Sequence, residues 1–600
     1  MKITITLLCM LACAPLTTTN AATIDVKLAP YYALGDGVSD DTNAIQAAID
    51  ENPNSVILLK NGTFKITNYL TLKNRRILKG ENGTLLYSSA NCGTMISCDS
   101  NVDILNLAIN GNNQATMGIS VLPNESYIFV SNCELFNFAG NSNRPAYGIQ
   151  ICNSTSDITI FDTSIHDIDG GADGIMGNYI GANRGILIGS TIRTIIDRCK
   201  IYNIGPWEDG DCIHVQTDPS DVIIRGSEFY NFKKRAVKVQ ASGVVVTNNL
   251  ISCDYAVDGI DAPYSGISIY SGNCEVSNNT IILNRALVGI EFRGDNVQVN
   301  NNYVDVYGHY TLCRGTYIRS LYVEGSNYCS VTNNTLLNYY SSVTVNNSYD
   351  NVISNNNILH QLPWLFDFIN CTNDDNMISD NIDYSTVLAG FWRFNVASDA
   401  SSAYDFSTHA LADCANCTYT TGYIGGALQF NGSAPPNNSF TNLSSFNLQL
   451  KANTSIAFWI KSDNPVGYGS HPYYPGIFSS SSNGSYDNFI TFRQSSSGYA
   501  NILYEDENGA SGMSDVFPYI TGEWVHITIV MDNNNVHFYV NGAARGTLPA
   551  SAPINLRYLG CGYGGAYNHG ALKGRIDEFM YFNKTLSAEE VNNIYLKREL

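Results

Sequence analysis

Residues 208–216 read EDGDCIHVQ, and residues 232–240 read FKKRAVKVQ. The two stretches are offset by 24 positions and share one pattern, in which Ile213 falls on Val237. Strand-like stretches that recur at such an offset are typical of successive coils in a β-solenoid, where each coil repeats the one beneath it. The pair therefore predicts parallel strands that stack directly on one another.

The same alignment superimposes side chains of unlike charge on the two coils. The superimposed pairs are Asp209 over Lys233, Asp211 over Arg235, and His214 beside Lys238. Acids, bases and a histidine that gather on one face of an all-β rod indicate a functional site, because core positions are apolar. Stabilising ion pairs between neighbouring coils are the alternative interpretation of the same charges.

A short segment, often ending in paired asparagines, recurs between about residue 131 and residue 382. Segments with paired asparagines include residues 246–249, 276–279, 299–302, 331–334 and 353–356. Apolar residues at a period of two precede each pair, and asparagine tolerates the left-handed conformation that a sharp corner needs. A propeller would need four strands and about 40 residues per unit. The repeat therefore predicts an all-β fold, a parallel β-helix.

Before the repeat, residues 35–49 read GDGVSDDTNAIQAAI. An Asp/Thr cap followed by apolar residues at helical spacing predicts a short helix, which would close the end of the solenoid. Asp36, Asp40 and Asp41 resemble catalytic acids when viewed alone, but their place before a helix favours capping and turn roles.

After about residue 384 the asparagine repeats stop and a different strand pattern begins. Alternating residues at 456–460, 523–527 and 536–540, with an Asn-Gly turn at 541–542, predict an antiparallel β-sandwich.

The run from Gly35 to Ile49 and the coils that follow resemble the pectate-lyase-like superfamily of right-handed parallel β-helices, in its rhamnogalacturonase and epimerase-like branch. The later strands resemble the laminin-G/concanavalin-like jelly roll. The expected domains are a signal peptide at 1–22, the β-helix at 23–386 and the jelly roll at 387–600. The second resemblance implies binding of sugars or proteins, sometimes through calcium, which makes calcium a cofactor candidate.

The first residues and the composition predict a secreted protein, located outside the cell or on its surface. Met1-Lys2, an apolar run and small residues through Ala22 form a signal peptide, and no later stretch predicts a membrane span. A net charge of −20 disfavours nucleic acid and anionic membranes as partners. The sixteen cysteines fit an oxidising compartment, and Cys92/Cys98 and Cys253/Cys274 are candidate disulfides.

Extending the coil alignment by two further coils gives two outward columns of polar side chains. One column reads His214, Lys238, Ser268 and Glu291, and its neighbour reads Gln216, Gln240, Tyr270 and Arg293. Adjacent coils lie about 4.8 Å apart, so a polysaccharide lying across this face would meet several of these groups. The expected substrate-binding residues are Gln216, Lys233, Arg235, Gln240, Tyr270, Glu291 and Arg293.

Hydrolysis of a polysaccharide is the first functional hypothesis. Asp209 and Asp211 would lie roughly 6.5–7 Å apart along one strand, which suits the acid and base of an inverting glycosidase. The sequence of residues 211–213 resembles the Asp-Asp-Cys-Ile motif of polygalacturonase-type hydrolases, with Gly210 in place of the first aspartate. The expected catalytic residues are Asp209, Asp211, His214 and Lys238.

Two alternatives remain open. β-Elimination on a uronate polymer needs a base and cations that neutralise the carboxylate. Candidate bases are Lys238, Arg235 and His214, with Lys233, Lys234 and Arg293 as neutralising groups. Because the family motifs are incomplete, a non-catalytic glycan-binding or adhesive protein is the other alternative. In each case the expected partner is a polysaccharide, and the oligomeric state stays open.

Overall fold

The structure is a computed structural model, and it divides into two compact units, Met1–Ile382 and Asp383–Leu600. It describes the chain except for residues 1–20, 82, 91, 141–143, 170–181, 206–209, 218–219, 254–263, 285, 308–317, 339–340, 360–365, 370, 372–375, 380, 384–387, 393–401, 405–410, 424–425, 433–439, 464–475, 480–488, 495–498, 507–508, 519–521, 550–552, 561–571 and 597–600. The predicted signal peptide therefore lies almost wholly outside the described residues.

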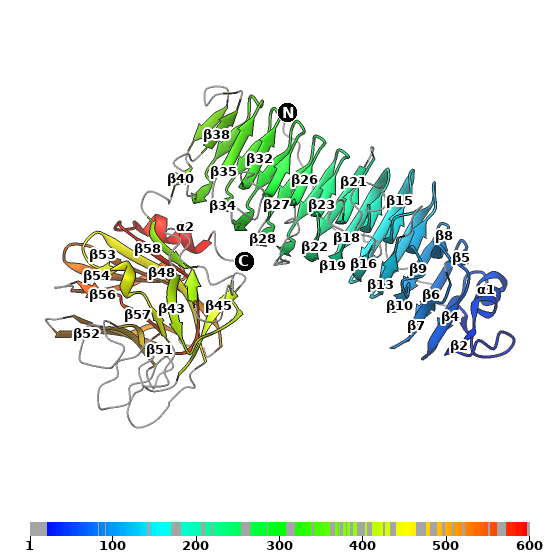
Figure 1. Ribbon diagram of the computed structural model, residues 1–600, viewed down its shortest axis with the longest axis horizontal. Helices are drawn as coiled ribbons and strands as arrows, with labels where there is room; N and C mark the ends of the chain where they lie inside the picture. Colours follow the sequence, from blue (N-terminus) through cyan, green and yellow to red (C-terminus); the bar gives the residue numbers. More distant parts are fainter. Residues whose placement is uncertain are drawn as a thin grey trace. The chain divides into compact units, whose positions relative to one another are not determined.

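The first unit contains three parallel sheets that run along its length (Figure 1). The first sheet contains β1 (Thr23–Asp25), β3 (Val56–Leu59), β6 (Arg76–Gly80), β9 (Val102–Leu105), β12 (Ser126–Ser131), β15 (Thr155–Phe161), β18 (Thr191–Asp197), β21 (Ser220–Arg225), β24 (Val244–Thr247), β27 (Glu275–Ser277), β30 (Gln298–Asn300), β33 (Ser330–Thr332), β36 (Val352–Ser354) and β39 (Met377–Ser379). The second contains β2 (Asp36–Asp40), β4 (Thr63–Ile66), β7 (Leu85–Ser88), β10 (Ala108–Asn110), β13 (Glu134–Ala139), β16 (Ser164–Asp169), β19 (Lys200–Ile204), β22 (Glu228–Phe232), β25 (Leu250–Cys253), β28 (Thr280–Asn284), β31 (Tyr303–Tyr307), β34 (Thr335–Asn338), β37 (Asn357–Leu359) and β40 (Ile382–Asp383). The third contains β5 (Leu70–Leu72), β8 (Thr94–Cys98), β11 (Met117–Val121), β14 (Tyr147–Ile151), β17 (Arg184–Ile188), β20 (Asp211–Val215), β23 (Arg235–Val239), β26 (Ser265–Ile269), β29 (Val288–Phe292), β32 (Arg319–Glu324), β35 (Ser341–Asn346) and β38 (Phe366–Ile369).

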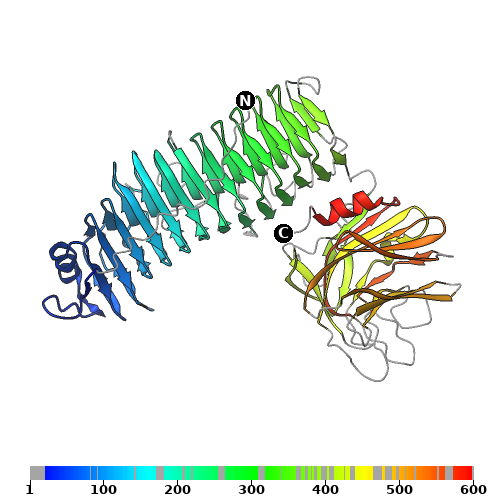
Figure 2. The same ribbon diagram turned by 180° about the vertical axis from the view of Figure 1, so that it is seen from behind.

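Each coil adds one strand to the third, first and second sheet in turn, which confirms the predicted parallel β-helix (Figure 2). Ile213 pairs with Val237, and Val237 pairs with Ile267 on the following coil. This is the register that the sequence alignment predicted. A one-residue slip would turn every inward side chain outward, so the apolar positions fix the register.

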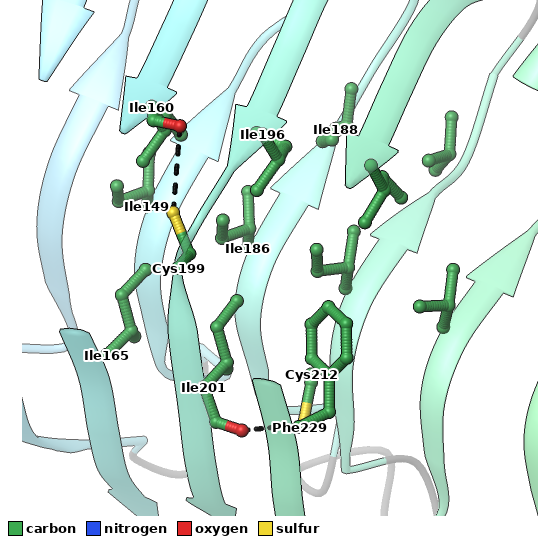
Figure 3. Close-up of a cluster of buried hydrophobic side chains, with 14 of the residues drawn as sticks. Ile149, Ile160, Ile165, Ile186, Ile188, Ile196, Cys199, Ile201, Cys212 and Phe229 are labelled. Atoms are coloured by element: carbon green, nitrogen blue, oxygen red, sulfur yellow. Dashed lines mark hydrogen bonds between the residues drawn. The ribbon is translucent and has the colours of Figure 1, made fainter. Parts of the chain in front are cut away.

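The core runs through the middle of the stack and is built from apolar side chains of all three sheets (Figure 3). Within one coil, Ile186, Ile196 and Ile201 each come from a different sheet and are fully buried. Ile149 pairs with Ile186 across the coils, so isoleucine stacks on isoleucine. Burial of one such side chain contributes about 1.5–3 kcal/mol.

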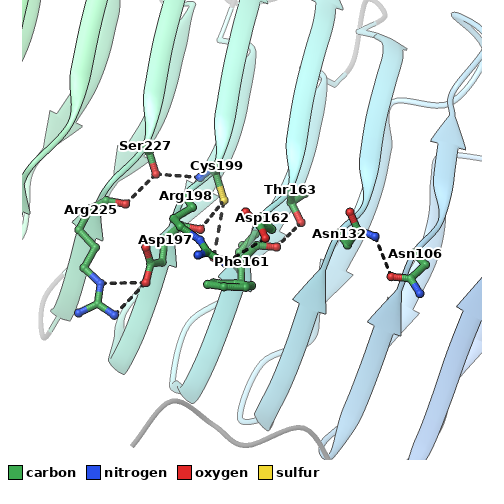
Figure 4. Close-up of polar contacts among 11 residues, drawn as sticks. Asn106, Asn132, Phe161, Asp162, Thr163, Asp197, Arg198, Cys199, Arg225 and Ser227 are labelled. Carbon is green, nitrogen blue, oxygen red and sulfur yellow. Dashed lines mark hydrogen bonds and ion pairs between the residues drawn. The ribbon is translucent and has the colours of Figure 1, made fainter. Parts of the chain in front are cut away.

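The corners between the first and second sheets use left-handed residues, as predicted for the asparagine pairs. Asn278 and Asn301 have φ values of 56°, and the corresponding corner residues of other coils include Asp162 and Arg198. Several corner side chains bond to the preceding coil, as the Asn132 amide does to Asn106 (Figure 4). The first asparagine of each pair therefore makes the turn.

The second asparagine of each pair is buried and forms a ladder inside the helix, which the sequence analysis missed. The amide of Asn302 donates to Asn334 Oδ1 at 3.0 Å and to the Val276 carbonyl at 2.8 Å. Its own Oδ1 accepts the Asn279 amide at 2.9 Å. The same contact joins successive members of the asparagine ladder, which are Asn249, Asn279, Asn302, Asn334, Asn356 and Asn381.

At the N-terminal end of the stack, α1 (Thr42–Glu51) packs against β5. Asp41 accepts hydrogen bonds from backbone N–H groups in residues 34–35, and Asp40 accepts one from Thr42. Asp36 accepts two more within its own turn. The turn roles predicted for these three aspartates are confirmed, and Asp41 is the N-cap residue of α1, but its side chain makes no capping hydrogen bond to the helix.

The predicted disulfides Cys92/Cys98 and Cys253/Cys274 are wrong. Cys98 is a free thiol that points into the core from β8, whereas the free Cys92 contacts Ser88. The thiols of Cys253 and Cys274 donate hydrogen bonds to carbonyl groups of the preceding coil. These inward positions bury cysteine as a small apolar residue, so closeness in sequence does not bring two sulfur atoms together.

The second unit contains two antiparallel sheets and is the predicted sandwich. One sheet contains β41 (Leu388–Trp392), β44 (Thr418–Thr421), β45 (Gly426–Asn431), β48 (Thr454–Ser462), β53 (Trp524–Met531), β54 (Asn535–Val540), β55 (Ala543–Pro549) and β58 (Lys573–Phe582). The other contains β42 (Ser402–Tyr404), β43 (Leu411–Ala415), β46 (Phe440–Asn442), β49 (Gly476–Ser479), β50 (Phe489–Gln494), β51 (Tyr499–Asp506), β52 (Gly509–Pro518) and β57 (Tyr558–Leu559). The remaining elements are the β47 (Gln449–Leu450) and β56 (Ile554–Asn555) pair, a short 3-10 helix at Ser444–Phe446, and α2 (Ala588–Leu596).

Among the described residues, neither helix has the length and apolar character needed to cross a bilayer.

Candidate functional site

The outer face of the third sheet carries both columns that the sequence analysis predicted. His214 pairs with Lys238, Lys238 with Ser268, and Ser268 with Glu291. In the second column, each backbone N–H group donates to the carbonyl of the residue just before the column member on the preceding coil. These bonds are Gln240 to Val215, Tyr270 to Val239 and Arg293 to Ile269. Both columns are therefore confirmed, and they cross β20, β23, β26 and β29 (β23 and β26 are labelled in Figure 1).

The polar side chains on this face, most of which are joined by hydrogen bonds or ion pairs, are together called the outer ladder. Its members are Arg184, Asp211, His214, Gln216, Arg235, Lys238, Gln240, Tyr264, Tyr270, Glu291, Arg293 and Glu324.

Asp211 lies between two arginines at one end of the outer ladder. The register places Arg184, Asp211 and Arg235 on three successive strands. Arg184 Nε lies 3.3 Å from Asp211 Oδ2, and Arg235 Nη1 lies 3.3 Å from Asp211 Oδ1. Asp211 is 0% exposed although its position faces outward, and Arg184 is 3% exposed. This carboxylate is therefore placed to orient two guanidinium groups, and it has no contact with solvent.

The charge of Asp211 acts on its neighbour. Burial alone would lower the pKa of Arg235, but Asp211, together with Tyr270 and Glu291, raises that pKa above its ordinary value. Arg235 is therefore held as a cation at any physiological pH.

His214 continues the network towards the surface. Arg184 Nε lies 3.2 Å from His214 Nδ1, and His214 Nε2 lies 2.7 Å from Gln240 Oε1. His214 is buried, whereas Gln240 is exposed. Both ring nitrogens are therefore engaged, which makes the imidazole a connection between a buried arginine and an exposed amide.

Glu291 is the centre of the other half of the outer ladder. Tyr264 and Tyr270 both donate their hydroxyl groups to the Glu291 carboxylate, the former at 2.8 Å. Burial, followed by the charge of Glu291, raises the pKa of each tyrosine, so both stay protonated donors. Glu291 is 0% exposed, like Asp211.

The ring of Tyr270 lies between two guanidinium groups. Arg235 is 5.8 Å from the ring centroid and Arg293 is 5.3 Å from it. Cations at these distances are attracted to the ring face. Arg293 also bonds to Glu324 at 2.8 Å, which extends the outer ladder to β32.

Members of the outer ladder differ in their access to solvent. Asp211 and Glu291 are buried, as are Arg184 and Arg235, while the Arg293 side chain is 43% exposed. Lys238 and Lys233 are half-buried, and Gln216 and Gln240 are exposed. The accessible surface therefore presents mainly ammonium, guanidinium and amide groups, together with the Glu324 carboxylate that pairs with Arg293.

Sequence reasoning missed Arg184, Tyr264 and Glu324. The signal was available, because Ile186 precedes Ile213 by 27 residues and Leu321 follows Ile290 by 31 residues, with both pairs in register. Carrying the alignment one coil further in each direction would have reached Arg184 and Glu324.

Two expectations from the sequence, a catalytic Asp209 and a bound calcium ion, have no corresponding arrangement of side chains among the described residues. Asp209 lies outside the described residues. Within the part of the chain that the structure describes, no group of three or more His, Cys, Asp or Glu side chains is arranged to hold a metal ion. In the sandwich, the buried Asp577 accepts a hydrogen bond from the Tyr423 backbone.

Two family patterns match the sequence. The pattern described as the right-handed β-helix region matches residues 184–313, and that of the concanavalin A-like lectin/glucanases superfamily matches residues 435–592. The chain therefore carries a right-handed β-helix followed by a concanavalin-like domain, as the two resemblances implied.

Several solved structures are similar to parts of the chain. Domain 4 of AbnA, a GH43 extracellular arabinanase from Geobacillus stearothermophilus in complex with arabinotriose, is 18% identical, with 35% of this chain and 98% of that chain covered and a TM-score of 0.27. PfbA, a surface adhesin of Streptococcus pneumoniae, is 13% identical, with 56% and 90% covered and a TM-score of 0.44. The botulinum neurotoxin serotype D binding domain is 19% identical, with 36% and 52% covered and a TM-score of 0.28. A search of curated protein sequences finds no match.

Proposed function

We propose that this chain, in which a right-handed β-helix is followed by a concanavalin-like domain, is a secreted protein that binds an acidic polysaccharide along the outer ladder. The observation that carries this proposal is the separation of charges on that face. Asp211 and Glu291 are buried together with Arg184 and Arg235, whereas Lys238, Arg293 and the two glutamine amides are half-buried or exposed. The one carboxylate of the ladder with exposed surface, that of Glu324, pairs with Arg293. The concanavalin-like domain is proposed to hold the protein on its polymer or on a cell surface.

Because the whole chain is negatively charged, a local set of cations on the outer ladder indicates an anionic ligand at that place. With a net charge of −20, the protein repels polyanions in general, so an anionic chain needs a local set of cations. Lys233 and Lys238 on one coil, with Arg293 two coils further on, supply such a set. From β20 to β32 the outer ladder spans four strand spacings, about 19 Å, which is long enough for an extended oligosaccharide.

For cleavage, β-elimination fits this face better than hydrolysis by a carboxylate pair. An inverting glycosidase needs two carboxyl groups that reach the substrate and the attacking water. The carboxylates of this face that could form such a pair, Asp211 and Glu291, are both fully buried and engaged by arginine or tyrosine side chains. We propose Lys238 as the base, with Arg293 and Lys233 neutralising the uronate carboxylate.

In this reaction the base removes the proton on the carbon beside the carboxylate. The released electron pair forms a carbon–carbon double bond, and the glycosidic C–O bond on the next carbon breaks. The leaving oxygen takes a proton from the solvent or from a protonated group of the site. No oxidant or metal ion enters the balance, and cations near the carboxylate lower the barrier.

A panel of uronate and neutral polysaccharides tests the proposal. We expect binding of uronate polymers, a rise in ultraviolet absorbance from the unsaturated product, and loss of both signals at high salt. Arg293→Gln should weaken binding, whereas Arg198→Gln should not. Arg198 is a suitable control because it is also exposed and also ion-paired, to Asp162, at a corner outside the third sheet.

The outcomes separate the candidate functions. Equal binding of neutral and uronate polymers would overturn the anionic ligand. New reducing ends without absorbance would indicate hydrolysis. Binding without either product would leave the non-catalytic glycan-binding protein, which the burial of Asp211 and Glu291 also favours.

A further inference from the structure

A chain of hydrogen bonds links the buried Arg184 to the exposed Gln240 through His214. We infer that Arg184 fixes the direction of these bonds, so that Gln240 presents its NH2 group, and not its oxygen, to the ligand. This inference rests on the proposed function, because it names a donor that selects the acidic sugar of that site. Gln240 is thus a specificity-determining residue, and Arg184 and His214 are positioning residues.

The direction follows from the chemistry of the first member. A guanidinium group has only N–H donors and no acceptor. Arg184 Nε lies 3.2 Å from His214 Nδ1, so Nδ1 must offer its lone pair. A neutral imidazole with a free lone pair on Nδ1 carries its proton on Nε2.

The proton on His214 Nε2 sets the direction of the second hydrogen bond, the one to Gln240. His214 Nε2 lies 2.7 Å from Gln240 Oε1, so the N–H group donates and the amide oxygen accepts. With its oxygen turned towards the imidazole, the Gln240 amide directs its NH2 group away from it. Gln240 is exposed, so this group is available to a ligand.

The buried end cannot easily reverse the chain. Arg184 Nε also lies 3.3 Å from Asp211 Oδ2, and its Nη1 donates to the Asn183 carbonyl at 2.8 Å. Arg184 is 3% exposed and Asp211 is fully buried. The guanidinium orientation is therefore set by groups that the ligand does not touch, and the amide donor is fixed before binding.

The neighbours of Gln240 suggest what it recognises. Lys238 lies two residues earlier on the same outward side, roughly 6.5–7 Å away along the strand. Tyr270, one coil further, directs its hydroxyl to Glu291 and not outward. The half-buried Lys238 and the exposed Gln240 thus place two donors side by side, which suits the oxygens of a sugar carboxylate. Unlike an ammonium group, the amide donor does not titrate.

The first test compares two substitutions that add the same charge on adjacent coils. Gln240→Glu keeps the size of the side chain and an oxygen for His214, but replaces the outward NH2 group with an acceptor. We expect about 10- to 100-fold weaker binding of a uronate oligosaccharide, the effect of losing one hydrogen bond to a charged group. Thr217→Glu is the control, because it adds the same charge one coil away at an exposed residue outside the outer ladder. An equal loss in both variants would refute the donor role of Gln240.

The second test needs no ligand. In protein labelled with 15N-histidine, the His214 signals should show an unprotonated Nδ1 and a protonated Nε2 at neutral pH. These signals are assigned to His214 because they are absent from the spectrum of the His214→Gln variant. Arg184→Met should yield a mixture of tautomers. A proton on Nδ1 in the unsubstituted protein would overturn the inference. If no acidic polymer binds while the Nε2–H tautomer is observed, the proposed function fails and the hydrogen-bond direction stands.

Discussion

The Asp211→Asn substitution separates a structural role of this carboxylate from a catalytic one. Asp211 is fully buried, and one oxygen lies 3.3 Å from Arg184 while the other lies 3.3 Å from Arg235. Asparagine has nearly the same shape, so the packing is kept. It removes the negative charge, however, and leaves two buried guanidinium groups on neighbouring strands without a carboxylate between them.

The expected cost follows from this geometry. Removing one partner of a buried ion pair costs about 3–5 kcal/mol, because the remaining charge stays out of water. At the lower limit, about 3 kcal/mol corresponds to a rise of about 100-fold in local opening. Asp197→Asn is the matched control. Arg225 donates to Asp197 at 2.8 and 2.9 Å on an exposed corner, where such a pair contributes about 0.2–1 kcal/mol.

Amide hydrogen exchange read by mass spectrometry measures both variants. Because each coil of a solenoid contacts only its neighbours, faster exchange in Asp211→Asn should be confined to β17, β20 and β23. If these strands exchange no faster than in Asp197→Asn, the reasoning about buried charge is wrong. Loss of polymer cleavage with unchanged exchange would make Asp211 a catalytic residue.

Three further predictions concern the fold. Asn302→Ala removes an amide that bonds to two coils and should cost about 2–4 kcal/mol in local exchange, whereas Asn301→Gly at the exposed corner should cost little. Arg193 holds the pKa of Asp157 below its ordinary value of 3.8, so the folded state favours the carboxylate. The unsubstituted protein should therefore melt at a higher temperature than Asp157→Asn at pH values above 3.8, and this difference should disappear as the pH falls through the pKa of Asp157 in the folded state. Burial raises the pKa of Cys133 and Cys199 to about 12, so mass spectrometry should find both unreacted with a thiol reagent until the chain unfolds.

The register of the β-helix could be predicted from sequence because it depends on a simple periodicity. Ile213, Val237 and Ile267 recur at positions where only an inward apolar side chain fits, and the structure pairs them in that order. The same alignment placed Glu291 and Arg293 on the correct columns.

Burial on the outer face could not be predicted in the same way. Alternation along a strand tells which side chains face outward, but not whether they reach water. Glu291 faces outward between the inward Ile290 and Phe292, and Asp211, two residues before the inward Ile213, joins the same outer network through Arg184 and Arg235. Both are nevertheless buried, because arginines and tyrosines from neighbouring coils cover them. Those partners lie 21 to 27 positions away along the chain, and an alignment of strands does not tell how far a side chain of one coil reaches over its neighbour.

The paired asparagines and the cysteines show a second limit. In each pair both residues are polar, and the pattern does not tell that Asn302 is buried while Asn301 is exposed. Cysteine spacing suggested disulfides, yet the predicted partner Cys253 points inward and its thiol donates to the Phe232 carbonyl. The burial of the second asparagine and that of the cysteine thiol both depend on hydrogen-bonding groups that a neighbouring coil supplies. These groups become apparent only when the coils are stacked.

The asparagine ladder also bears on how a rod of this kind can change its length during evolution. From Asn249 to Asn381, each rung offers the same donor to one neighbour and the same acceptor to the other. A duplicated coil from this stretch would find matching groups on both sides, with no compensating substitution. Towards the N-terminus the equivalent positions are Ser227 and Cys199, whose side chains bond to backbone carbonyls, and an inserted asparagine would meet no such match. Coils are therefore exchangeable modules beyond β32, where repeats can be gained or lost while the spacing of the outer ladder stays the same.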